Sequence, residues 1–131
     1  MKNLKLMAIA ILVWGSQAIN ANNLVVRNNG EGQFDLKISF TNGETENTNN
    51  MLHKKTIHLR DREIKSIKVI YGVSATMQEF NPTFINDINS RIRAKPTTDF
   101  TLTIEIEGNT VDFIFAPTHL NSDPTAVVGQ L

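Results

Sequence analysis

The chain has 131 residues, with 13 Lys and Arg against 13 Asp and Glu, so its formal net charge is zero. This nearly neutral balance disfavours nucleic-acid binding by bulk charge, which usually requires a clearly basic domain. The absence of cysteine excludes disulfide bonds, thiol catalysis and cysteine-based zinc sites.

Residues 1–21 have the layout of a cleavable secretory signal peptide. Lys2 and Lys5 form a positive n-region, and the apolar run from Leu6 to Trp14 follows them. A membrane-spanning helix needs about 20 apolar residues, so this run is too short to act as an anchor. No cysteine follows the run, which excludes lipoprotein-type acylation.

Small residues after the apolar run favour cleavage after Ala21, which makes Asn22 the first residue of the mature chain. Cleavage after Ala18 is the alternative. Removal of Lys2 and Lys5 leaves 11 basic against 13 acidic residues in a single domain, residues 22–131. A chain of this length is large enough for one modest hydrophobic core.

Several strands are predicted in the first half of this domain. Leu24–Val26 is a short strand, followed by a turn rich in Asn and Gly. Residues 34–41 alternate between apolar and polar, which predicts a strand with one buried face. Residues 42–50 contain no apolar side chain and predict an exposed, mobile loop.

Two further strands, residues 55–59 and 64–71, are predicted to pair with each other around a turn at residues 60–63. The second of them carries apolar residues on both faces, which favours a central position in its sheet.

One helix is predicted to begin after Asn81, with Pro82 in its first position, and to end before Pro96. Its apolar residues recur at helical spacing: Phe84, Ile85, Ile88 and Ile92. Residues 100–107 and 111–115 then predict a hairpin around Gly108 and Asn109. Residues 127–128 are a candidate last edge strand.

These elements predict a mainly β domain, either an antiparallel β-sandwich or an open barrel, of five to six strands with one crossover α-helix. The predicted core consists of the inward residues of the strongest strands: Phe34, Leu36, Ile38, Phe40, Leu102, Ile104, Ile106, Phe113 and Phe115.

Charge is distributed unevenly along the domain. Residues 51–71 carry six basic and two acidic side chains, whereas residues 99–131 carry five acidic side chains and no Lys or Arg. We therefore predict a cationic hairpin over residues 53–68 that binds an acidic partner: a lipid headgroup, a glycan or a protein. The candidate ligand-binding residues are Lys54, Lys55, His58, Arg60, Arg62, Lys65 and Lys68.

The alternative is that these cations only pair with acids of the hairpin at residues 101–115. The two hypotheses make different predictions for the loss of charge at Arg60 and Arg62. If the hairpin binds an acidic partner, neutralising both should weaken binding and leave thermal stability nearly unchanged.

No metal, cofactor or catalytic site is predicted. The candidate metal ligands have no spacing that enforces a tetrahedral site: His53, His58, Asp61 and His119. The candidate nucleophiles Ser66 and Ser74 are not flanked by a nucleophile-elbow motif. Glu105 and Glu107 lie two residues apart on the solvent-exposed face of a predicted strand. This arrangement is typical of a hydrated strand surface and does not indicate a pair of catalytic carboxylates.

The signal sequence, LMAIAILVW followed by INA, and the cysteine-free β domain resemble the small, lineage-restricted exported proteins of Gram-negative bacteria. This resemblance implies residence in the periplasm or outside the cell, and a binding rather than a metabolic role. Some of those proteins leave through type II secretion as host-directed factors.

Three functions remain open. The first is a non-enzymatic binding module that uses the cationic hairpin. The second is an assembly subunit that exposes edge strands, at Leu24–Val26 or at residues 127–128, for β-augmentation. The third is a hydrolase whose site no motif reveals.

Overall fold

The structure is a computed structural model that describes residues 22–118 and 126–131. This part of the chain contains nine strands and the helix α2 (Pro82–Ala94). The strands are β1 (Asn23–Asn28), β2 (Phe34–Phe40), β3 (Thr45–Met51), β4 (Lys54–His58), β5 (Ile64–Tyr71), β6 (Thr76–Glu79), β7 (Phe100–Glu107), β8 (Thr110–Pro117) and β9 (Val127–Gln130). The predicted signal peptide and His119 lie outside the described residues.

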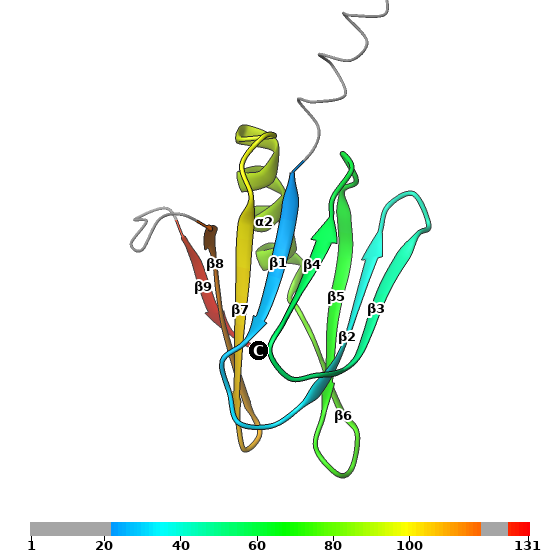
Figure 1. The fold of residues 1–131 in the computed structure, drawn as a ribbon, viewed down its shortest axis with the longest axis vertical. Coiled ribbons are helices and arrows are strands. Elements are labelled where there is room, and N and C mark those ends of the chain that lie inside the picture. Colours follow the sequence, from blue (N-terminus) through cyan, green and yellow to red (C-terminus); the bar gives the residue numbers. More distant parts are fainter. Residues whose placement is uncertain (1–21, 119–125) are drawn as a thin grey trace, which may run out of the picture.

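The strands form two sheets that face each other across one core (Figure 1). The five-stranded sheet has the order β4-β1-β7-β8-β9, and the four-stranded sheet has the order β3-β2-β5-β6. Neighbouring strands are antiparallel except β1 and β7, which are parallel. This mainly β sandwich with one helix confirms the predicted fold class, with more strands than the five or six expected.

The core is built from alternate residues of strands in both sheets, because successive side chains of a strand point to opposite faces. In β2, for example, Leu36 and Ile38 are buried and Lys37 between them is exposed. Eight of the nine predicted core residues are buried, and Ile106 is partly buried against the core.

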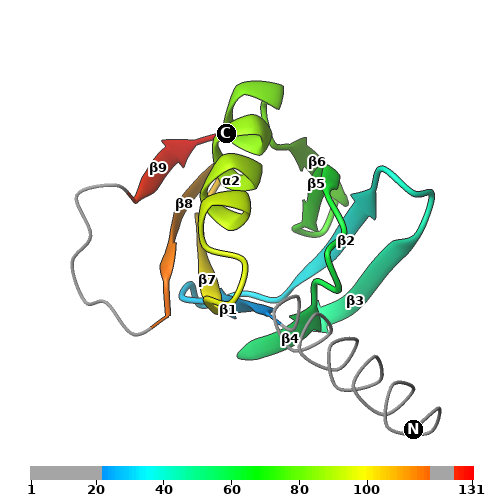
Figure 2. The ribbon, with the colours of Figure 1, turned by 90° about the horizontal axis from the view of Figure 1, so that it is seen from above.

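The helix α2 covers the side of the sandwich between β5 and β9 (Figure 2). It begins as predicted, with the Asn81 side chain accepting a hydrogen bond from the backbone N of Thr83 at 2.9 Å. Gly129 in β9 permits this packing, because a Cβ added there would lie 2.5 Å from the ring of Phe84.

Asn89 fixes α2 to the start of β5. Its Oδ1 accepts a hydrogen bond from the backbone N of Ile64 at 3.0 Å, and its Nδ2 donates to the carbonyl of Ile64 at 2.8 Å. Both polar atoms of this buried amide are therefore satisfied, as a buried polar side chain requires.

Two strand predictions were wrong. Residues 42–50 are not a loop, since most of them belong to β3, which pairs with β2 at the edge of the four-stranded sheet. An edge strand with little buried area needs few apolar residues, so alternation does not reveal it. Leu24–Val26 is not an edge either, because β1 lies between β4 and β7.

The predicted hairpin of residues 55–59 and 64–71 does not form. β4 pairs with β1 in the five-stranded sheet, whereas β5 lies between β2 and β6 in the other. The two strands bury residues such as Ile57 and Ile67 in the same core from opposite sheets. An alternating pattern shows that one face of each strand is buried, and this is equally true of strands that lie side by side and of strands that face each other.

Candidate binding surface

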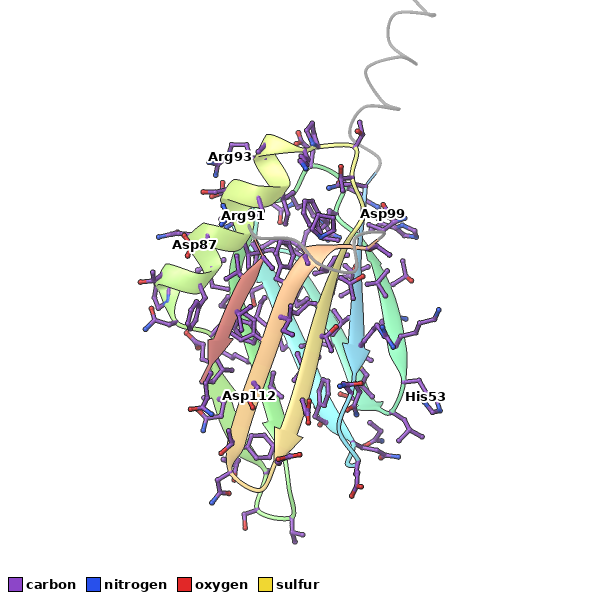
Figure 3. All side chains as sticks on the ribbon, turned by 90° about the vertical axis from the view of Figure 1, so that its left-hand side faces the viewer. His53, Asp87, Arg91, Arg93, Asp99 and Asp112 are labelled. Carbon is purple, nitrogen blue, oxygen red and sulfur yellow. The ribbon has the colours of Figure 1, made fainter. Side chains whose placement is uncertain are left out.

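The seven predicted site residues do not form one surface, because they are divided between the two sheets. Three lie on β4, two in the connecting turn and two on β5: Lys54, Lys55, His58, Arg60, Arg62, Lys65 and Lys68. Basic residues are also spread over different sides of the molecule, as Figure 3 shows for Arg93, at the upper left on α2, and for His53, at the right-hand side.

Arg62 is a structural residue. Its side chain is only 8% exposed. Its guanidinium is surrounded by two backbone carbonyls, one aromatic ring and two carboxylates: Leu59 O at 3.0 Å, His58 O, the Phe40 ring at 3.9 Å, Glu44 at 3.6 Å and Glu46 at 3.5 Å. We therefore expect its neutralisation to lower stability, contrary to the expectation from sequence.

Lys68 is also paired. Its ammonium lies 3.7 Å from the carboxylate of Glu79 on the neighbouring strand β6. On α2, Arg93 lies 3.6 Å from Glu63. The acids that pair with Arg62, Lys68 and Arg93 therefore come from β3 and the turn before it, from β6 and from the 59–63 turn, and not from the hairpin at residues 101–115.

The other predicted cations are exposed, and in the described part of the chain no carboxylate lies within 4.0 Å of Lys54, Lys55, Arg60 or Lys65. Arg27, which the sequence analysis missed, forms one group of charges with Lys54 and Lys55. It is exposed on β1 and is the direct register partner of Lys54. Only the β1–β4 register brings these charges together, so no local sequence signal could have identified Arg27.

We call Arg27, His53, Lys54 and Lys55 the β4 cluster. Arg27 and Lys54 project from the outer face of the five-stranded sheet, because their neighbours Leu24 and Val26 alternate onto the inner face. Lys55 shares the inner strand face with Ile57 but remains exposed, since β4 is the edge of its sheet. His58, farther along β4, is held by a 2.6 Å hydrogen bond between its Nδ1 and the Asn23 side chain.

An edge strand with lysines has a second interpretation. Charged side chains on an edge discourage the pairing of its free backbone groups with other chains. Under this interpretation the lysines of β4 only prevent aggregation. It does not account for Arg27, which lies on the central strand β1.

The candidate metal and catalytic residues do not converge in the described residues. No group of three or more His, Asp or Glu that could hold a metal ion occurs in residues 22–118 and 126–131. Ser66 lies opposite Ser39 on the outer face of the four-stranded sheet, and Ser74 lies in the turn before β6. Neither of them is bonded to a histidine within those ranges.

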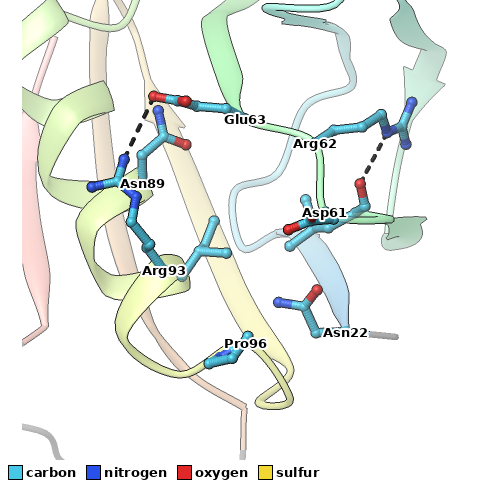
Figure 4. A pocket seen from close by; sticks show the side chains of 9 residues that line it. Asn22, Asp61, Arg62, Glu63, Asn89, Arg93 and Pro96 are labelled. Carbon is cyan, nitrogen blue, oxygen red and sulfur yellow. Dashed lines mark hydrogen bonds and ion pairs between the residues drawn. The ribbon is translucent and has the colours of Figure 1, made fainter. Parts of the chain in front are cut away.

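A pocket of about 170 Å³ lies between the 59–63 turn and the C-terminal half of α2 (Figure 4). Asn22, the predicted first residue of the mature chain, lines it and is only 3% exposed. The preceding residue, Ala21, lies outside the described residues. The sequence analysis did not identify this pocket, because its walls come from three separate segments.

Within the two described ranges, no helix combines the length and the apolar character that crossing a membrane requires. Comparisons of the chain with protein-family models, with curated proteins and with solved structures gave no match.

Proposed function

We propose that the protein is exported to the periplasm or the extracellular medium, and that residues 22–131 act there as a non-enzymatic binding module. The support for export is the positive n-region and the short apolar run at the start of the sequence. The resemblance to small exported proteins of Gram-negative bacteria extends this proposal to a host-directed factor released by type II secretion.

The proposed ligand is a polyanion that contacts the β4 cluster. The observation that carries this proposal is the pairing of Arg27 with Lys54, two exposed like charges in direct cross-strand register. Like charges in this position destabilise a sheet slightly. No carboxylate within 4.0 Å compensates them in the described part of the chain. A bound polyanion would remove the repulsion between Arg27 and Lys54. Ligand binding would therefore stabilise the pairing of β1 with β4.

The test compares two single charge reversals. Lys54→Glu lies in the β4 cluster. The control Lys37→Glu changes an exposed lysine on the outer face of the other sheet, where its register partner Lys68 is paired with Glu79. Binding of heparin, of vesicles with anionic lipid and of a poly-glutamate peptide is measured at two salt concentrations. We expect Lys54→Glu to weaken binding of one of these probes by about tenfold or more at low salt. Loss of one basic residue near an anionic surface costs about 1 kcal/mol, which is about fivefold in affinity, and the added carboxylate repels the ligand.

We expect Lys37→Glu to leave the affinity nearly unchanged. Binding should also weaken as salt is added, because exposed charges are screened over about 8 Å at physiological ionic strength. Equal losses in the two variants would show that only net charge matters. Absence of binding to all three probes at low salt would reject the polyanion as ligand.

A second candidate function, an assembly subunit, is favoured by one observation at the opposite edge of the five-stranded sheet. β9 is the last strand there, and its Val128 is 64% exposed beside its register partner Ile114, which is 49% exposed. Sedimentation of the wild type and of Val128→Lys tests this candidate. A concentration-dependent oligomer that Val128→Lys dissociates would favour assembly, and a monomer at all concentrations would reject it.

A further inference from the structure

The predicted cleavage site of the signal peptide lies next to a firmly held residue. Asn22, the first residue of the mature chain if cleavage follows Ala21, is only 3% exposed. Its backbone carbonyl accepts a hydrogen bond from the N–H of Leu59 at 3.1 Å, and the N–H of Asn23 donates to the carboxylate of Asp99 at 2.8 Å. The first residues of a domain are usually poorly ordered unless such contacts hold them. Cleavage would therefore produce an α-ammonium group in a fixed position.

This ammonium group would lie close to a carboxylate. The backbone N of Asn23 is 2.8 Å from Oδ1 of Asp99, and successive backbone nitrogens are at most about 3.7 Å apart. The backbone N of Asn22 therefore lies within about 6.5 Å of that oxygen. A carboxylate has two oxygens and accepts several hydrogen bonds. Asp99 can therefore accept from the N–H of Asn23 and from the ammonium group together.

Asp99 is itself held in place, at the end of the sheet where β1 and β7 begin. These two strands run parallel, with Leu24 opposite Phe100. The carbonyl of Asp99 accepts a hydrogen bond from the N–H of Thr118 at 2.9 Å, and the residue is half-buried. Figure 3 shows Asp99 beside the start of β1. Because both charged groups are held by the backbone, an ion pair between them requires little further ordering.

The other charged groups around Asn22 do not oppose this attraction. The pocket that Asn22 lines carries the carboxylates of Asp61 and Glu63 and the guanidinium groups of Arg62 and Arg93 (Figure 4). Each guanidinium lies within 3.6 Å of a carboxylate, whereas Asp61 has no ion pair in the described part of the chain. The surroundings of Asn22 are therefore negative on balance, which favours a positive charge there.

We propose that removal of the signal peptide creates an ion pair between the new α-ammonium group of Asn22 and the carboxylate of Asp99. In the precursor the same nitrogen belongs to an uncharged peptide bond, so the precursor lacks this pair. The pair fixes the start of β1 against β7 and makes the mature chain more stable than the precursor. It rests on the proposed export and on cleavage after Ala21, and it does not involve the β4 cluster.

The test begins with mass spectrometry of the protein recovered from an expressing bacterium, which identifies its N-terminus. Calorimetry then gives the melting temperatures of four forms: the wild type and Asp99→Asn, each with a free and with an acetylated α-amino group. The pKa of an α-amino group is about 7.7–8.0 and that of lysine about 10.4, so acetylation at about pH 6.5 selects the α-amino group. Asp99→Asn keeps an oxygen that can accept from Asn23.

We expect acetylation to lower the melting temperature of the wild type by about 4 °C, the shift that loss of one charged contact produces in a domain of this size. In Asp99→Asn the shift should be below about 1 °C. The acetyl group also adds bulk, and the comparison removes this contribution because it is the same in both backgrounds. The control Asp112→Asn, on β8, should lose as much as the wild type, because Asp112 bonds Gln130 and lies far from Asp99 in Figure 3.

Four results would overturn the proposal. The first is an acetylated wild type that melts at the same temperature as the free form; this measurement needs no substitution and therefore decides the question even if Asp99→Asn does not fold. The second is an equal acetylation effect in the wild type and in Asp99→Asn. The third is an effect that Asp61→Asn abolishes and Asp99→Asn does not, which would assign the ammonium group to the pocket.

The fourth is a mature chain that begins at Ile19, which would reject the ion pair and leave the proposed export intact. A soluble extracellular product that retains residues 6–14 would reject both. Export and the ion pair are therefore tested separately by the same preparation.

Discussion

Arg60 and Arg62 lie two residues apart in the same turn, and the structure predicts opposite consequences for their truncation. Arg60 is exposed and has no ion-pair or hydrogen-bond partner in the described part of the chain. Arg62 lies in the turn that connects the two sheets, and its side chain is only 8% exposed. Arg60→Ala and Arg62→Ala remove the same charge, so their difference measures the contacts of Arg62 alone.

The expected loss follows from those contacts. A hydrogen bond from a charged group contributes about 1.5–3 kcal/mol, and Arg62 donates to two backbone carbonyls. The cation–π contact with Phe40 adds about 0.5–1 kcal/mol. The ion pairs with Glu44 and Glu46 add about 0–1 kcal/mol, because both carboxylates are about half exposed. These contributions overlap, so we expect Arg62→Ala to lower the free energy of unfolding by about 2–4 kcal/mol.

Urea denaturation provides the assay. The midpoint should fall in Arg62→Ala with an unchanged m value, whereas Arg60→Ala should remain within about 0.5 kcal/mol of the wild type. Arg60→Gly should raise stability by about 0.4–1 kcal/mol, because glycine adopts the φ of 53° without strain. If Arg62→Ala and Arg60→Ala differ by less than about 0.5 kcal/mol, the structural role assigned to Arg62 is wrong.

Three further predictions concern the core, the helix and the N-terminus. Ile104→Ala should lower the free energy of unfolding by about 2–5 kcal/mol, because Ile104 is fully buried; a loss below about 0.5 kcal/mol in calorimetry would mean that the faces of β7 are reversed. Gly129→Ala should cost about 1–3 kcal/mol by forcing the Phe84 ring aside, and a neutral effect on the melting temperature would argue against this packing of α2. Mass spectrometry of exported protein should find Asn22 at the N-terminus, with Ile19 as second choice, and a soluble extracellular product that retains residues 6–14 would reject the signal peptide.

The local sequence pattern was sufficient to predict those elements whose position and buried face depend on residues close together in the chain. The alternation of Phe34–Phe40 predicted β2 and its buried face, and Asn81 with Pro82 predicted the start of α2. The hairpin of β7 and β8 followed from Gly108, whose φ is 60°. In each case the residues that predict the element lie within or next to it, so the sequence of that segment is enough for the prediction.

The candidate binding surface was predicted less well. Lys54 and Lys55 are exposed as expected, but Arg62 and Lys68 from the same set are paired. The basic run in the sequence indicates where cations are frequent. Whether each cation is free depends on acids that the fold brings to it, and those acids lie up to 18 residues away in the chain for Arg62 and Glu44.

The sequence by itself determined that this is a mainly β domain with one helix, which residues face its core, and that its basic and acidic segments are separate. The tertiary structure alone decided that β4 and β5 face each other from two sheets, that Arg27 lies beside Lys54, and that Asn22 and Asp61 line one pocket. The physical reason is that alternation reports the burial of a strand face, which is a local property. Strand pairing and pocket formation depend on which distant segments pack together in the core. The free energy that favours one pairing over another comes from contacts throughout that core, so no single segment of the sequence contains it.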